Sequence, residues 1–358
     1  MEPDALVVEQ PRRAIWPGVV GIAGFAAIFA LALDWAKWTP YLHKLEAIRR
    51  THLWPGHDIL AKAGAAHAPP SFHGAWAFTA AYANAVWPAV VAGLVIAAAI
   101  ETLVPRRWFL RTVGRRTHAG GSLAGGVLAL PSLMCTCCTA PVAATLRRSG
   151  APTSAVLAYW LGNPVLNPAV LAFLALVAPW QWVTTRIVAG LVLVFGVSAA
   201  IARIAARETR PAAVDLELLP SFRLADAPRR YLISLARICA TLLPEYAVVV
   251  FLLGLFRGWI FPFDGSAAPW GILAVVVAAL LGTLVVLPTG GEIPIVQGLA
   301  AAGVAAGVQG ALLIALPAIS LVSMAMVARD LSVRVTVAAG VGVAAVSVAA
   351  GALLALLA

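Results

Sequence analysis

Residues 131–141 read Pro131-Ser-Leu-Met-Cys-Thr-Cys-Cys-Thr-Ala-Pro141, and they interrupt an apolar stretch that runs from Gly120 to Leu146. Each arm of this stretch holds about ten residues, which corresponds to about 15 Å of α-helix. The hydrocarbon core of a bilayer is about 30 Å thick. The arms therefore predict a re-entrant hairpin, which enters a membrane to half its depth and returns to the same face.

The whole chain has the composition of a membrane protein. Of its 358 residues, 62% are hydrophobic and 11% are charged, and the mean hydropathy is +0.93. Soluble domains carry roughly 45–50% apolar and about 25% charged residues, so the composition excludes a soluble enzyme. The net charge of +10 indicates basic cytoplasmic loops beside anionic lipid. Nucleic acid is not an expected partner.

Seven apolar stretches have the length of a membrane crossing. They lie at 14–33, 76–100, 153–177, 184–206, 231–255, 308–328 and 335–358. The chain divides into a leading helix with a His-containing extracytoplasmic loop (1–75), a first repeat (76–206), a basic cytoplasmic linker (207–230) and a second repeat (231–358). The loop holds five of the six histidines, whose spacings match no compact metal site.

The two repeats share a series of prolines and glycines at matched spacings. The pairs are Pro88 and Pro244, Pro131 and Pro288, Pro141 and Pro294, Gly150 and Gly303, and Pro164 and Pro317. In both halves the last three marks are separated by nine and then by 14 residues. This repetition predicts an internal duplication, with a second hairpin around Leu287–Pro294.

The distribution of arginines sets the expected orientation of the halves. The clusters at 106–116 and 203–230 are both expected in the cytoplasm, because Lys and Arg in short loops stay inside. Both remain inside if the stretch 120–146 does not cross, and the second hairpin then enters from outside. We therefore predict an all-α polytopic membrane protein with one leading transmembrane helix and two inverted repeats, each of three transmembrane helices and a re-entrant hairpin. Nine full crossings with a parallel repeat is the alternative.

The tip of the first hairpin carries Cys135, Cys137 and Cys138. Thiolates select soft, thiophilic ions such as Cu(I), Zn(II) or As(III). Free cysteines are also among the most buried residues, so packing is the competing interpretation. Because three cysteines fall within four positions at a proline-bounded break, we predict that they bind substrate and act as metal or metalloid ligands.

The second tip and the following breaks supply oxygen and nitrogen groups. Thr289 offers a hydroxyl and Glu292 a carboxylate. Charges deep in a membrane usually face a cavity or a proton pathway, so Glu292 is the candidate for proton coupling as well as for substrate binding. Asn163 and Asn167 lie beside prolines, and they either line the substrate site or satisfy the helix break. Transporters place paired broken elements of this kind around a substrate site near the midplane.

Three motifs resemble the family of predicted permeases related to organoarsenical efflux permeases. They are Cys135-Thr-Cys137 with Pro141 behind it, Gly162-Asn-Pro-Val-Leu-Asn-Pro168, and Leu287-Pro-Thr-Gly-Gly-Glu-Ile-Pro294. The resemblance covers about Trp76 to Ala358. It implies a membrane permease, and some members export trivalent organoarsenicals while others export heavy metals such as copper or zinc. It also implies Cys135 and Cys137 as substrate thiols, whereas Cys138 stands where a hydroxyl residue is usual.

The sequence thus predicts a multi-pass inner-membrane permease that moves a thiophilic solute, either a trivalent organoarsenical or a soft metal ion, by alternating access around the two tips. The resemblance favours efflux. The expected partners are the lipid bilayer and the solute; no cofactor is expected, and the oligomeric state is left open. One alternative is an importer of a sulfur compound such as thiosulfate. The other is a membrane thiol-disulfide oxidoreductase, which would need a quinone or a partner thiol; no second redox cysteine pair occurs elsewhere in the sequence.

Overall fold

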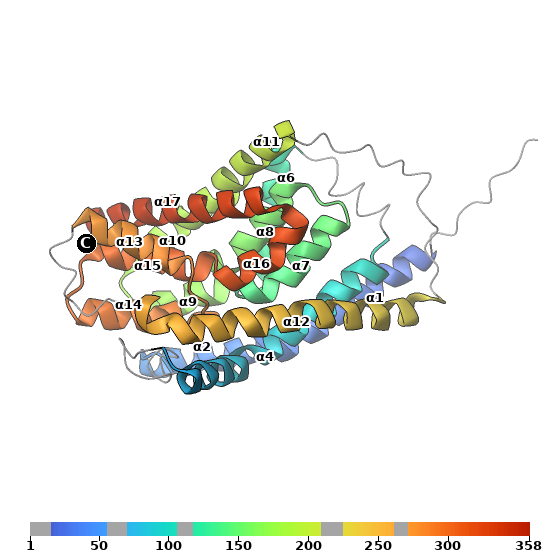
Figure 1. Ribbon diagram of the computed structural model, residues 1–358, viewed down its shortest axis with the longest axis horizontal. Coiled ribbons are helices and arrows are strands. Elements are labelled where there is room, and N and C mark those ends of the chain that lie inside the picture. The colour runs from blue at the N-terminus through green and yellow to red at the C-terminus, as the bar shows by residue number, and fades with distance from the viewer. Residues whose placement is uncertain (1–15, 56–69, 106–116, 209–224, 261–270) are drawn as a thin grey trace, which may run out of the picture.

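The computed structural model describes residues 16–55, 70–105, 117–208, 225–260 and 271–358, and within these ranges it contains helices and no strand. Helices satisfy every backbone polar group within one segment, which lipid requires. Four long helices run along the length of the molecule (Figure 1): α1 (Trp16–Leu33), α4 (Phe72–Leu103), α12 (Ala227–Ile260) and α17 (Val333–Leu357). The predicted all-α membrane fold is confirmed.

Shorter helices fill the space between the long ones. In the first half they are α6 (His118–Ala129), the 3₁₀ turn η2 (Leu130–Ser132), α7 (Thr136–Arg148), α8 (Thr153–Val165), α9 (Pro168–Val177), α10 (Trp180–Leu191), the π-helical η3 (Val192–Val197) and α11 (Ser198–Glu208). In the second half they are α13 (Ile272–Gly282), α14 (Glu292–Ala301), α15 (Ala306–Ala318) and α16 (Leu321–Leu331).

Six segments of the described chain are long and apolar enough to cross a membrane. They are Trp16–Thr51, Phe72–Leu103, Thr153–Val177, Trp180–Ala206, Ala227–Phe256 and Val333–Leu357, and the bent pair α15 and α16 makes a seventh if it counts as one span. Each of these segments overlaps one of the seven predicted stretches. The helices α6, α7, α13 and α14 hold only 10 to 13 residues each, so none of them crosses a bilayer alone.

The leading helix is longer than the sequence predicted, which is a correction. The chain continues from α1 through a π-helical segment, η1 (Asp34–Trp38), into α2 (Thr39–Thr51). The charges after Leu33 suggested a water-exposed loop, but Lys37 and Ile48 are buried. They point from one helix face toward the interior of the protein. Of the five predicted loop histidines, His43 lies in α2, His52 caps it and His73 lies in α4, while His57 and His67 lie outside the described residues.

The two halves repeat the same order of elements. Each begins with a long helix that contains an internal proline, α4 or α12, and continues with two short helices, α6 and α7 or α13 and α14. A 13-residue helix with proline in its last turn then follows, α8 or α15. It leads into a short helix, α9 or α16, and finally into a long helical segment, which is the continuous run α10–η3–α11 in the first half and α17 in the second. The internal duplication predicted from proline spacing therefore extends to secondary structure.

Backbone details repeat as well. Gly150 and Gly303 both have positive φ, of 100° and 77°. The amides at Gly150 and Ala151 donate to Arg147 and Leu146, and those at Gly303 and Val304 donate to Ala300 and Leu299, all at 3.0 Å. Both are the glycine-terminated helix end in which a left-handed residue satisfies the last carbonyls. The corresponding glycines Gly150 and Gly303 thus terminate the corresponding helices α7 and α14.

The short helix pairs lie toward opposite ends of the molecule. Figure 1 shows α6 and α7 in the right half of the view and α13 and α14 at its left end. α6 packs against α8, and α13 packs against α15. An inverted repeat requires an arrangement of this form. Three features stay predictions: the inverted repeat itself, the two re-entrant hairpins, and the side of the membrane that each hairpin faces. The linker 207–230 lies largely outside the described residues.

Candidate functional site

The cysteine segment begins where the chain breaks between α6 and α7. The 3₁₀ turn η2 ends at Leu133, whose φ of 50° is left-handed, and Cys135 is extended at the start of α7. Such a break frees backbone groups, which lipid cannot satisfy. The side chain of Asn163 accepts a hydrogen bond from the Met134 amide at 3.3 Å. The break is therefore held by a buried asparagine of α8.

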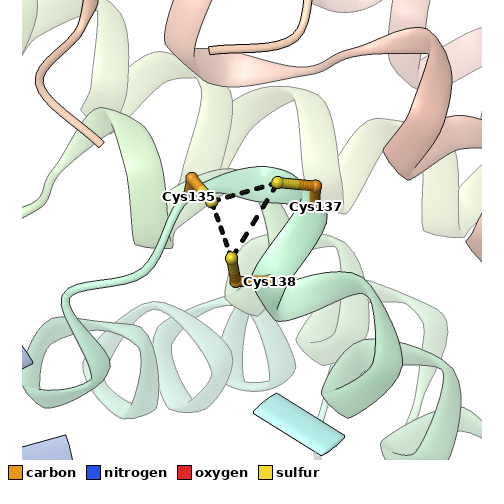
Figure 2. A group of neighbouring side chains, drawn as sticks. All are labelled: Cys135, Cys137 and Cys138. Atoms are coloured by element: carbon orange, nitrogen blue, oxygen red, sulfur yellow. Dashed lines mark hydrogen bonds between the residues drawn. The ribbon is translucent and has the colours of Figure 1, made fainter. Parts of the chain in front are cut away.

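The three cysteines of this tip form a triangle of sulfur atoms (Figure 2). Cys135 Sγ lies 3.1 Å from Cys137 Sγ and 3.0 Å from Cys138 Sγ, and the third side measures 3.9 Å. All three side chains are buried. A tetrahedral ion with metal–sulfur bonds of about 2.3 Å needs sulfurs about 3.8 Å apart. Small side-chain rotations would bring the triangle to that size, so the cluster is suited to one thiophilic centre.

Aromatic hydroxyls and a glycine surround the sulfurs. Tyr82 of α4 has its hydroxyl 3.3 Å from Cys137 Sγ, and the Tyr246 hydroxyl of α12 donates to the same sulfur at 3.8 Å. Gly93 of α4 lies against Cys138, where an added Cβ would be 2.4 Å from the Cys138 carbonyl oxygen. The long helices of both halves thus define the position of the cysteine tip.

A cavity of about 480 Å³ brings the two tips together. Cys135 lines it from the first tip, and Thr289 lines it from the second tip. The remaining walls include Trp35, Tyr41, Trp54 and Trp87, together with Lys37 and Lys44. A volume of this size falls within the range of small-molecule sites, about 300–1,000 Å³. Residues of both tips, Cys135 and Thr289, therefore line one cavity.

The leading helix holds both tips. Lys37 Nζ donates to Thr289 Oγ1 at 3.3 Å and to the Tyr41 hydroxyl at 3.0 Å. The neighbouring Trp38 Nε1 donates to the Pro131 carbonyl at 2.8 Å. One helical turn therefore contacts the first tip on one side and the second tip on the other. The segment expected to be a peripheral loop is part of the site.

Glu292 begins α14 and forms a fully buried ion pair with Arg186 of α10. The two side chains are 1% and 0% exposed, and Arg186 Nη1 lies 2.6 Å from Glu292 Oε1. Arg186 also donates to the Pro164 and Val165 carbonyls at 2.8 and 3.0 Å. The Pro164 carbonyl lacks a helical partner because residue 168 is proline and has no N–H. Arg186 therefore links the helix break of the first half to the second tip.

The predicted site residues divide into three groups. Cys135 and Thr289 line the cavity, and Cys137 and Cys138 stand behind Cys135. Glu292 lies at the second tip but is turned to Arg186. The two asparagines serve the backbone: Asn163 supports the cysteine tip, and Asn167 caps α9 by accepting from the amides of residues 169 and 170.

Three cationic residues at the site were missed by the sequence interpretation. Arg186 is the only charged residue in the sequence between Arg148 and Arg203, and an isolated charge in a membrane helix is itself a signal of function. Lys37 and Lys44 recur seven positions apart with Tyr41 between them, a spacing that places side chains on one helix face. The charges were interpreted as signs of a loop, and their periodicity was the overlooked signal.

Comparison with known proteins agrees with this architecture. The family described as "predicted permease" matches residues 71–356. The UPF0718 protein YraQ of Escherichia coli (strain K12) is 36% identical over 333 residues, which cover 92% of this chain and 93% of that protein. No solved structure matches the chain. The motifs, the six or seven candidate spans and the two comparisons lead to one conclusion: the chain belongs to the predicted permease family.

Proposed function

We propose that this permease moves a small thiophilic solute through the membrane and binds it at Cys135, Cys137 and Cys138. The main observation behind this proposal is the buried triangle of sulfurs, one of which, Cys135, lines a cavity that residues of both tips border. Soft sulfur ligands favour soft ions and metalloids. The solute class is a trivalent organoarsenical or a soft metal ion such as copper or zinc. The family implies transport rather than catalysis.

The two halves would alternate around the tips. α7 of the first half packs against α4 and α8 of its own half and against α16 of the second half. Rocking of one half against the other would expose the cavity first to one side of the membrane and then to the other. The direction we propose is efflux across the inner membrane.

Glu292 would couple transport to protons through its ion pair. Arg186 and Glu292 neutralise each other in the closed pair. A carboxylate that takes up a proton loses its charge and its attraction for Arg186, so protonation would release the second tip from α10. Glu292→Gln should then bind solute without pH-dependent transport, and Glu292→Asp should retain the pH dependence.

Transport into everted membrane vesicles tests the proposal. We expect ATP-independent uptake of methylarsenite, arsenite, Cu(I) or Zn(II) by vesicles that contain the wild-type protein. Cys135→Ser and Cys137→Ser should each abolish uptake, because a hydroxyl has the shape of a thiol but is a poor ligand for a soft ion. The matched control is Cys239→Ser, whose cysteine lies in α12 outside the triangle. Unchanged uptake in the Cys135/Cys137 double variant, at equal abundance, would refute the thiol site.

A further inference from the structure

The cavity that meets the cysteine tip has positively charged walls. Lys37 and Lys44 both line it, and among the lining residues that the structure describes there is no Asp, Glu or His. Lys37 is only 6% exposed. Its hydrogen-bond partners, the Tyr41 and Thr289 hydroxyls, are neutral groups. Among the salt bridges of the described residues, none includes Lys37 or Lys44.

In the described part of the chain, no carboxylate forms an ion pair with these lysines. Glu292 is the carboxylate next to the cavity wall, and it is engaged by Arg186 at 2.6 Å. Lys44 Nζ lies 3.5 Å from the centre of the Trp54 ring, a contact that orients an ammonium without removing its charge. An ammonium held in a buried site without a carboxylate partner is costly, and the Cys135 thiol in the same cavity compensates it only when it is ionised. The cavity is therefore arranged to receive negative charge.

We propose that the solute is an anion that also carries a soft atom. Its anionic group occupies the space beside Lys37, Lys44 and the Thr289 hydroxyl, and its soft atom lies against Cys135. This inference rests on the proposed function, and it narrows the thiophilic solutes to those with a carboxylate or an oxyanion group. Two sources have that shared chemistry: an organic metalloid or sulfur compound with a carboxylate, and a sulfur oxyanion such as thiosulfate.

The shape of the cavity suits both sources. Its volume of about 480 Å³ accommodates an aromatic or aliphatic body in addition to the charged group. Indole and phenol rings of Trp35, Tyr41 and Trp54 form part of the wall. A bare metal cation would instead meet two ammonium groups before it reached the sulfurs, and like charges at close range repel.

Two matched probes separate the contribution of the anionic group to binding affinity from the contribution of the thiophilic arsenic. Phenylarsine oxide and its 4-carboxy derivative carry the same thiophilic arsenic and differ in the anionic group. With purified full-length protein in nanodiscs, we expect the carboxylated probe to bind at least about tenfold more tightly, a difference of about 1.4 kcal/mol. Thiosulfate should compete with it, whereas sulfate, which lacks a soft atom, should compete weakly. Strong competition by thiosulfate identifies the sulfur oxyanion source, and weak competition identifies the organic one.

Lysine variants test whether Lys37 and Lys44 cause the preference for the carboxylated probe. Lys37→Met and Lys44→Met should each reduce the preference for the carboxylated probe, and the double variant should abolish it. Lys37→Arg should retain the preference. Arg50→Met is the control, because Arg50 lies on the same helix with an exposed side chain paired to Glu46. Binding of phenylarsine oxide reports whether each variant is folded. If Lys37→Met does not fold, Lys44→Met still tests the proposal, because Lys44 is only half-buried.

The outcomes distinguish this inference from the proposed function. Equal affinity of the wild type for both probes, or a preference that survives in the double lysine variant, would overturn the anion site and leave the thiol site intact. Normal binding of both probes to Cys135→Ser would overturn the thiol site, whatever the lysine variants show.

Discussion

Arg186 and Glu292 form an ion pair that is withdrawn from water, and the pair connects two separate breaks in regular structure. Glu292 begins α14 after the second tip, and Arg186 caps the carbonyls of Pro164 and Val165 at the end of α8. Removing one partner of a buried pair leaves an uncompensated charge. The pair therefore acts as a structural link as well as a candidate site for coupling.

Single substitutions at this pair should be strongly destabilising. We expect Glu292→Gln and Arg186→Met each to lower the free energy of unfolding by about 3–5 kcal/mol. The double variant should lose less than the sum, because neither buried charge is then left alone. Chemical denaturation of the purified proteins in detergent measures all four states of the cycle. Additive losses would show that the two side chains do not interact.

At the scale of elements, the two tips are related but unequal. Both have a left-handed residue two positions after a proline, Leu133 after Pro131 and Gly290 after Pro288. Leu133 and Pro141 are eight positions apart, whereas Gly290 and Pro294 are four positions apart. Four residues are about one turn of helix. The first half thus contains one additional turn, and the cysteines occupy it.

The glycine-terminated helix ends at Gly150 and Gly303 allow the internal duplication to be tested through backbone conformation. Gly303 has a φ of 77°, and an added Cβ would meet nothing within 4 Å. Gly303→Ala should therefore destabilise the protein through backbone conformation alone, by about 1–2 kcal/mol.

Gly298 provides the control for this substitution. It lies inside α14, also with open space at its Cβ position. Gly298→Ala should stabilise the protein by roughly 0.5–1 kcal/mol, because alanine favours a helix interior. Thermal unfolding in detergent compares the two variants. Equal melting temperatures would contradict the left-handed helix end at Gly303.

At the scale of the whole molecule, apolar length and proline spacing predicted the seven spans and the two broken tips. These features are local, so a single sequence carries them. The pairing of Arg186 with Glu292 joins residues 106 positions apart, and no local pattern indicates which helices become neighbours. The leading helix was misread for a related reason: Lys37 and Lys44 resemble loop residues until the cavity that they face is known.

The inverted arrangement predicts that equivalent helix ends face opposite sides of the membrane. Ser149 and Ala302 precede the matched glycines Gly150 and Gly303. In a Cys239→Ser background, Ser149→Cys should react with an impermeant thiol reagent from the cytoplasm, and Ala302→Cys should react from outside. The native cysteines of the tip are buried and should contribute little labelling. Reaction of both sites from the same side would favour a parallel repeat.

The central claim is that the buried cysteine tip binds the solute, and equilibrium binding of methylarsenite to the purified protein tests it most directly. The chain has four cysteines, of which three form the triangle. We predict one equivalent bound by the wild type and by Cys239→Ser, and none by the Cys135→Ser/Cys137→Ser double variant. Undiminished binding by the folded double variant, or loss of binding in Cys239→Ser alone, would contradict the account.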